Sequence, residues 1–170
     1  EKSACAEITS TLKREYPQVK LVGVFVNSSV EEIKNILQTC HLDLAQLHGD
    51  ETPETFAQLA PHAFRAFRGI PESNAGYERN EAPAMLIDAA VKGVYGGSGV
   101  TADWTAAAEL AKKYPLLLAG GLTPENVADA VRQVQPWGVD VASGVESAPG
   151  EKDAGKMSAF VKAVRVAESK

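Results

Sequence analysis

The sequence LLLAGGLTPENV, at residues 116–127, joins a short apolar run to two glycines and a Thr-Pro-Glu triplet. The run LLLA has the length and composition of a buried strand. In the triplet, Thr123 is suited to cap a helix, Pro124 to take its first position, and Glu125 to face the positive end of the helix dipole. The stretch therefore predicts a strand, a tight turn and a helix in succession.

The same pattern recurs on both sides of this stretch. Apolar runs typical of strands lie at residues 21–26, 44–47, 64–67, 84–87 and 138–141. Successive runs start 20 to 32 residues apart, which leaves room for one strand and one helix. Strands that alternate with helical segments of this length pair in parallel through right-handed crossovers.

Helix signals separate the runs. Ser29 and Glu32 form a capping box, and Thr52-Pro53-Glu54 repeats the triplet described above. A first helix is predicted over about residues 2–16, with Ala4, Ile8 and Leu12 on one face. Asp103 is suited to cap a helix over residues 104–114, and residues 71–83 are predicted to form a loop or a short helix. The last predicted helix has an apolar stripe made of Met157, Phe160, Val161 and Val164.

This order of elements predicts an α/β fold in a single domain covering residues 1–170. Two architectures fit: the (β/α)8 TIM barrel and the open doubly wound sheet, which accommodates six strands. A helix comes first and six strand runs follow. A barrel would therefore contain strands 3 to 8 of the full pattern, with the N-terminal β-α-β, roughly 40 to 45 residues, absent.

The composition favours a soluble globular protein. Apolar residues make up 45% of the 170 residues, and 22 acidic against 17 basic side chains give a net charge of −5. This balance argues against a nucleic-acid-binding surface and against intrinsic disorder. No apolar run approaches the roughly 18 residues of a membrane span. Cys5 and Cys40 lack partners at metal-binding spacing, so we expect free thiols and a cytoplasmic protein.

In a parallel α/β protein, the chemistry lies at the carboxyl ends of the strands. Gly120-Gly121 follows one predicted strand, and Ser143-Gly144 follows the next. Paired glycines let backbone N–H groups approach an anion closely, so the two turns predict a phosphate-binding site. The alternative is that these glycines only make tight turns. The sequence GGSG at 96–99 lacks a complete phosphate fingerprint and predicts either a lid or a connector.

Polar residues at other strand ends complete the candidate site. Asp88 ends an apolar run, where partial desolvation suits a general acid; a turn-capping Asp is the alternative. Gln46 and His48 alternate with Leu47 and so share one strand face, although a lone histidine is more often structural. Asp140 lies between two valines and points away from them, and a buried carboxylate there needs a partner such as a substrate hydroxyl.

Five separated motifs form a set: GVFVN at 23–27, QLHGDE at 46–51, LID to DW across 86–104, LAGGLTPENV at 118–127 and VDVASGVESAPGEKD at 139–153. Together they resemble phosphoribosylanthranilate isomerase, an enzyme family of tryptophan biosynthesis, over nearly the whole chain and in the right order. The resemblance implies a (β/α)8 barrel that converts N-(5'-phosphoribosyl)anthranilate to 1-(2-carboxyphenylamino)-1-deoxyribulose 5-phosphate. This is an Amadori rearrangement that needs no metal or cofactor.

The resemblance also implies a role for each candidate residue. Asp88 would be the general acid that protonates the ribose ring oxygen. The other roles would be phosphate binding by Gly120, Gly121, Ser143 and Gly144, binding of a ribose hydroxyl by Asp140, and lining of the substrate pocket by Gln46 and His48. Ala142 stands where the family commonly has a serine, so backbone contacts would have to suffice there.

The front of the chain departs from the family pattern. The family's first strand carries Lys-Ile-Cys-Gly, whose cysteine is the general base, and the loop after its second strand carries Ser-Pro-Arg, whose arginine helps to hold the substrate. Neither motif occurs in this sequence. Cys5 and Cys40 lie in helical patterns and do not replace the base. We therefore expect a chain that begins in the second barrel helix and is, by itself, poorly active or unstable.

The residues are also compatible with two other functions. One is a different phosphate-binding barrel enzyme, such as thiamin phosphate synthase or a sugar-phosphate epimerase. The other is a non-catalytic phosphate-binding module. For the isomerase we expect a small phosphorylated substrate, no metal or cofactor, no nucleic-acid or membrane partner, and a monomer or homodimer.

Overall fold

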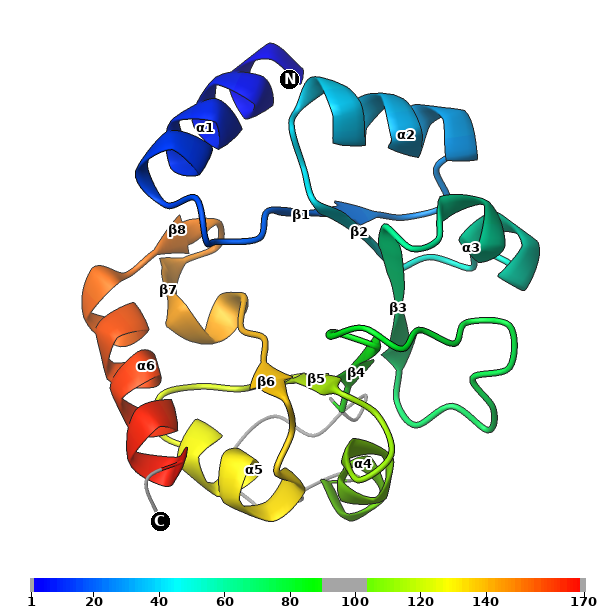
Figure 1. Ribbon diagram of the computed structural model, residues 1–170. Helices are drawn as coiled ribbons and strands as arrows, with labels where there is room; N and C mark the ends of the chain where they lie inside the picture. The colour runs from blue at the N-terminus through cyan, green and yellow to red at the C-terminus, as the bar shows by residue number, and fades with distance from the viewer. Residues whose placement is uncertain (1, 90–103, 169–170) are drawn as a thin grey trace. The chain divides into compact units, whose positions relative to one another are not determined.

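The computed structural model describes residues 2–89 and 104–168, which belong to two compact units. The first unit runs to Ala66 and includes Ser73–Arg79. The second comprises Phe67–Glu72 and the chain from Asn80 onward. Helices and strands alternate along both units (Figure 1).

The first unit pairs its strands in parallel. Its described elements are α1 (Lys2–Glu15), β1 (Val22–Phe25), α2 (Val30–Thr39), β2 (Leu44–Leu47), α3 (Pro53–Leu59) and β3 (Ala63–Arg68), the last of which ends in the second unit. Val24 of β1 lies beside Gln46 of β2, and Gln46 lies beside Phe64 of β3. The strand order in this unit therefore follows the chain order.

Capping side chains begin α2 and α3 where the sequence predicts. The Ser29 hydroxyl accepts a hydrogen bond from the Glu32 backbone N–H (3.2 Å). The Thr52 hydroxyl accepts one from the Thr55 N–H (3.3 Å), ahead of a proline in the first turn. These helices cover one face of the sheet, where the buried core consists of Phe25, Ile33, Ala45, Leu47, Phe56, Leu59 and Ala63.

The second unit repeats the plan and ends in a small hairpin. Its described elements are β4 (Met85–Asp88), α4 (Trp104–Ala111), β5 (Leu116–Ala119), α5 (Val127–Val134), β6 (Gly138–Val139), the 3-10 helix η1 (Ser143–Val145), β7 (Glu146–Ala148), β8 (Glu151–Lys152) and α6 (Ala154–Glu168). Strands β4, β5 and β6 are parallel and adjacent in that order. The antiparallel hairpin of β7 and β8 has no counterpart in the sequence predictions.

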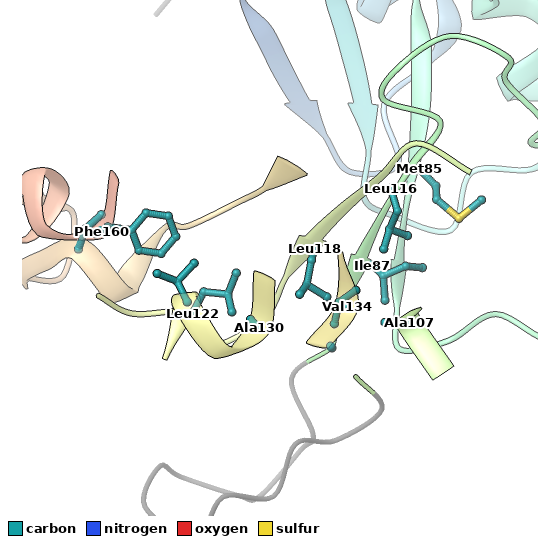
Figure 2. Packing of buried hydrophobic residues seen from close by; sticks show 12 residues of the cluster. Met85, Ile87, Ala107, Leu116, Leu118, Leu122, Ala130, Val134 and Phe160 are labelled. Carbon is teal, nitrogen blue, oxygen red and sulfur yellow. The ribbon is translucent and has the colours of Figure 1, made fainter. Parts of the chain in front are cut away.

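Alternate residues of β4 and β5 build the core of the second unit (Figure 2). The buried cluster includes Met85, Ile87, Leu116 and Leu118 from the strands, with Ala107 of α4, Ala130 and Val134 of α5, and Phe160 of α6. Successive strand residues point to opposite faces. The face of β4 that carries Leu86 and Asp88 is therefore the one turned away from the helices.

Helix α5 begins at Val127 and not at Pro124 as predicted. The Thr123 hydroxyl still accepts a hydrogen bond from the Glu125 N–H (3.3 Å), and the Thr123 carbonyl accepts one from the Val127 N–H (3.0 Å). The Asn126 side chain accepts a hydrogen bond from the Thr123 N–H (2.8 Å) and donates one to the Gly121 carbonyl (3.0 Å). These bonds hold the intervening residues in a turn. The helix can start only after that turn.

Some predicted apolar stripes are exposed. In α6, Phe160 is buried, but Met157 is 47% and Val161 is 46% exposed, so the prediction that both belong to the core-facing stripe is wrong. The packing of α6 against α5 explains this, because that contact covers only one side of the helix. Ile8 and Leu12 of α1 are likewise exposed.

The predicted strand runs are confirmed to within two residues at each end. Within each unit the strands follow the chain order, which is the order of a βα barrel and not the reversed order of a doubly wound sheet. Ring closure and the absent N-terminal β-α-β stay predictions. Residues 71–83 contain neither helix nor strand, whereas the GGSG at 96–99 and the cap at Asp103 lie outside the described residues. No helix in the described ranges is long and apolar enough to span a membrane.

Candidate functional site

Adjacent strands of the second unit bring candidate residues to one edge of the sheet. Asp88, the last residue of β4, pairs with Ala119, which ends β5 just before Gly120. The Asp140 N–H, directly after β6, donates to the Leu118 carbonyl of β5 (2.8 Å). The carboxylates and the Gly-Gly turn therefore gather at the carboxyl ends of β4, β5 and β6.

Asp88 is half-buried and lies on the strand face opposite the helices. The side chains of Met85 and Ile87 pack against the helices (Figure 2), so alternation along β4 places Asp88 on the other face. Its backbone carbonyl accepts a hydrogen bond from the Gly69 N–H (2.8 Å). The backbone of this strand end is thus held in place, and a carboxyl group there can transfer a proton to a bound ligand.

Two glycine-containing turns pack directly against each other in the second unit. Gly120 and Gly121 have φ angles of 100° and 62°, a left-handed region that favours glycine. A Cβ on Gly144 would overlap with the Leu122 carbonyl oxygen and lie 2.9 Å from the Leu122 carbonyl carbon. A Cβ on Gly121 would meet nothing within 4 Å. The Gly120-Gly121 turn thus has open space beside Gly121, whereas Gly144 lies against the backbone of Leu122.

Asp140 is exposed, so the prediction of a buried carboxylate at this position is wrong. Strand β6 ends at Val139, and Asp140 therefore lies beyond the sheet. Val139 and Val141 pack against the helix-covered core, so the alternation predicted for this segment holds. Ser143, also exposed, begins η1.

Gln46 and His48 form another group at the end of β2 in the first unit. Gln46 is 8% exposed, and His48 is half-buried directly after the strand. Gln46 Nε2 lies 3.2 Å from His48 Nδ1, which confirms that the two side chains share a face. An amide nitrogen can only donate, so Nδ1 accepts and the proton of the neutral imidazole is on Nε2. His48 thus presents an N–H donor at Nε2.

A buried ion pair beside Gly49 is the main feature that sequence reasoning missed. The Glu51 carboxylate accepts hydrogen bonds from the N–H groups of Asn27 (2.7 Å) and Gly49 (2.9 Å), and it pairs with Arg65. Arg65 also donates to the Gly49 carbonyl (2.6 Å). This network ties the chain after β1 and after β2 to β3, and so fixes the segment that carries His48.

Gly49 is required by that network. A Cβ at this position would lie 2.6 Å from the Asn27 nitrogen and 2.8 Å from Glu51 Oε1. Asn27 and Glu51 both stand in motifs quoted above, but their partners are 24 and 14 residues away in the sequence. No short sequence motif contains these partners together, so the hydrogen bonds of Glu51 to Asn27 and Arg65 could not be predicted from the sequence.

Neither cysteine of the described residues lies at a strand end. Cys5 is half-buried within α1, and Cys40 is buried at the end of α2. Burial and the neighbouring Cys5 thiol raise the pKa of the Cys40 thiol above its usual value. The surroundings of Cys40 therefore favour an unreactive thiol over a proton-abstracting thiolate.

In the described ranges, no three His, Cys, Asp or Glu side chains gather as a metal site would require. A hollow on the outer face of α6 is lined by Met157, Ser158, Val161, Lys162, Arg165 and Val166. It contains none of the predicted site residues. We therefore place the candidate site at the strand ends and not in this hollow.

The comparisons with known proteins agree with one another. A family model described as N-(5'phosphoribosyl)anthranilate (PRA) isomerase matches residues 1–163. A protein of Roseiflexus sp. (strain RS-1), named N-(5'-phosphoribosyl)anthranilate isomerase, is 54% identical over 156 residues, which are 88% of this chain and 72% of the relative.

Solved structures show the same likeness. The structure of TrpF from Jonesia denitrificans is 34% identical with a TM-score of 0.80, and the match covers 99% of this chain and 80% of that one. A phosphoribosyl anthranilate isomerase in complex with reduced 1-(o-carboxyphenylamino)-1-deoxyribulose 5-phosphate is 30% identical with a TM-score of 0.75, covering 98% of this chain and 80% of that one.

Proposed function

Because the chain belongs to the N-(5'-phosphoribosyl)anthranilate isomerase family, we propose that it acts in tryptophan biosynthesis on N-(5'-phosphoribosyl)anthranilate. The product is 1-(2-carboxyphenylamino)-1-deoxyribulose 5-phosphate. The reaction is an internal redox rearrangement in which an aldose derivative becomes a ketose derivative. The family match favours this function over other phosphate-binding barrels and over a non-catalytic module.

The observation that carries the proposal is the juxtaposition of an acid and two glycine-containing turns on adjacent strands. Asp88 pairs with Ala119, and Gly120 follows at once. Asp88 donates its proton to the ribose ring oxygen as the bond from that oxygen to C1 breaks, which opens the ring. The half-buried position of Asp88 at the end of β4, beside the Gly-Gly turn, supports this role.

The phosphate binds at the two turns that pack against each other. The backbone N–H groups of Gly120, Gly121, Ser143 and Gly144 are the proposed donors. Open space beside Gly121 and the close approach of Gly144 to Leu122 support this assignment. Ala142 has no hydroxyl group to add, so the backbone carries the phosphate contacts there.

Other substrate contacts are assigned to polar side chains. Asp140 accepts a hydrogen bond from a ribose hydroxyl, which agrees with its exposed position. Gln46 and His48 are proposed as substrate-binding residues in the first unit. The contact between Gln46 Nε2 and His48 Nδ1 (3.2 Å) holds the two side chains together on one strand face, which supports a shared role in substrate binding.

A general base must remove the proton from C2 after the ring opens, and neither cysteine of this sequence is placed for that step. Cys5 lies in a helix and Cys40 is buried at a helix end. A positioned base contributes roughly 10²- to 10⁴-fold to the rate. We therefore infer that these 170 residues, taken alone, convert substrate slowly.

A fluorescence assay of substrate consumption tests both parts of the proposal. It compares the 170-residue chain with the same chain joined to the part of the Roseiflexus relative that the match leaves uncovered. We expect slow turnover by the first protein and a rate about 10²-fold higher or more for the second. Equal rates would overturn the inference about the base, and no turnover by either protein would contradict the isomerase function.

A further inference from the structure

The loop after β6 is held by the hairpin that follows it. Lys152, at the end of β8, donates hydrogen bonds from Nζ to the Ala142 carbonyl (2.8 Å) and to Glu146 Oε1 (2.6 Å). These two acceptors lie on either side of the segment from Ser143 to Val145, which forms η1. One ammonium group therefore connects the beginning and the end of the proposed phosphate-binding loop.

Further bonds fix the same hairpin to the start of α6. Lys156 Nζ donates to the Glu146 carbonyl (2.6 Å), and the Asp153 N–H donates to the Val145 carbonyl (2.8 Å). The hydrogen bond from Lys152 lowers the pKa of Glu146, so its carboxylate stays charged at neutral pH. Glu146, which accepts a hydrogen bond from Lys152, is thus itself held in place by Lys156.

The bond to Ala142 has a directional consequence. The Ala142 carbonyl and the Ser143 N–H belong to one planar trans peptide and point in opposite directions. Fixing the carbonyl toward Lys152 therefore fixes the direction of the Ser143 N–H. A cationic donor on the carbonyl also polarises the peptide, which makes that N–H a stronger donor to an anion.

We propose that Lys152 is a positioning residue for phosphate binding: it orients and polarises the Ala142–Ser143 peptide and holds the loop so that the N–H groups of Ser143 and Gly144 face the phosphate. This inference rests on the phosphate site proposed above and deepens it. Lys152 acts through the loop backbone, because its ammonium group already binds a carbonyl and a carboxylate.

The test is a titration of the 170-residue protein with inorganic phosphate, followed by NMR, at about 20 mM and about 500 mM NaCl. The variants are Lys152→Met, Lys152→Arg, and Lys162→Met as a matched loss of one exposed charge in the same unit. We expect Lys152→Met to raise the Kd about tenfold or more at both salt concentrations. Lys152→Arg should recover part of the affinity, and Lys162→Met should match the wild type at high salt.

Amide hydrogen exchange without ligand gives an independent readout. In Lys152→Met, we expect faster exchange at Glu146 and Asp153, whose N–H groups bond to the Ser143 and Val145 carbonyls, and unchanged exchange at Val127. Wild-type affinity and wild-type exchange in Lys152→Met would overturn the positioning role. A Kd effect that disappears at high salt would also overturn it, in favour of a general charge effect. If the wild type binds no phosphate, the phosphate site fails, while exchange still decides whether Lys152 orders the loop.

Discussion

The backbone of Gly144 lies against the carbonyl oxygen of Leu122, so closely that a Cβ at position 144 would overlap with that oxygen. This contact joins the two turns of the proposed phosphate site. Thr123 Cα, 3.3 Å from the same Cβ position, closes the space further. The geometry leaves no room for a side chain unless one of the turns moves.

We therefore predict that Gly144→Ala both destabilises the protein and weakens phosphate binding. Overpacking of this kind costs about 1 to 3 kcal/mol, measured as a shift in the urea unfolding midpoint. The matched control is Gly150→Ala, because Gly150 has a φ of 83° but open space around its Cβ position. That change should cost only the strain of the left-handed backbone, about 1 kcal/mol, and leave phosphate affinity intact. Equal effects on binding from both variants would contradict the packing argument.

Glu51→Gln should be among the most destabilising single changes in the first unit. The Glu51 side chain is 2% and the Arg65 side chain 12% exposed, so neutralising the carboxylate leaves a buried guanidinium without its counter-charge. We expect a loss of about 3 kcal/mol in the free energy of unfolding. Glu109→Gln, in an exposed pair with Lys112, should have little effect on the free energy of unfolding, because solvent screens the pair. Similar losses in the two variants would show that the buried network contributes little.

The neutral form of His48 should carry its proton on Nε2. The Gln46 amide nitrogen donates a hydrogen bond to His48 Nδ1, so Nδ1 is the acceptor and carries no proton. Nitrogen-15 NMR of the imidazole ring at high pH distinguishes the two tautomers. Gln46→Leu removes the donor and should shift the population toward a mixture, whereas a wild-type spectrum with the proton on Nδ1 would refute the arrangement.

Asp43 should make stability depend on pH. Burial alone would raise the pKa of Asp43, but hydrogen bonds from Lys13 and the Leu21 N–H, with the charges of Lys13 and Lys20, hold it below its usual value. A carboxylate with a lowered folded-state pKa stabilises above its unfolded pKa of about 3.9 and loses that contribution as the pH falls through the folded-state pKa.

Asp43→Asn is therefore expected to cost about 1 kcal/mol at pH 7 and progressively less below about pH 4. Urea midpoints of the wild type and the variant across this range give the difference directly. Asp50→Asn, at an exposed position in the same unit, is the control. A difference for Asp43→Asn that is constant with pH would show that the ion pair is not its source.

The strands were predictable because each is a short apolar run, and the alternation of polar residues correctly placed Gln46 with His48. Helix starts were less predictable. The same Thr-Pro-Glu triplet precedes both helices, but α3 begins directly after Thr52, whereas α5 begins only at Val127. The difference lies in Asn126, whose side chain bonds to the Thr123 N–H and the Gly121 carbonyl and holds a turn there.

The supporting groups of the candidate site were not predictable from spacing. Glu51 meets Arg65 and Lys152 meets the Ala142 carbonyl only because the chain folds back on itself. Exposure of Asp140 was missed for a different reason. The apolar run that contains it continues past the end of β6, so the pattern overestimates the length of the strand.

The role of Asp88 as the general acid is tested most directly by the turnover number of Asp88→Asn in the chain joined to the uncovered part of the Roseiflexus relative. The amide keeps the shape of the side chain but has no acidic proton to donate to the ring oxygen. We predict a fall in kcat of roughly 10²- to 10⁴-fold with an unchanged Kd for inorganic phosphate. A kcat equal to that of the parent protein would contradict the assignment.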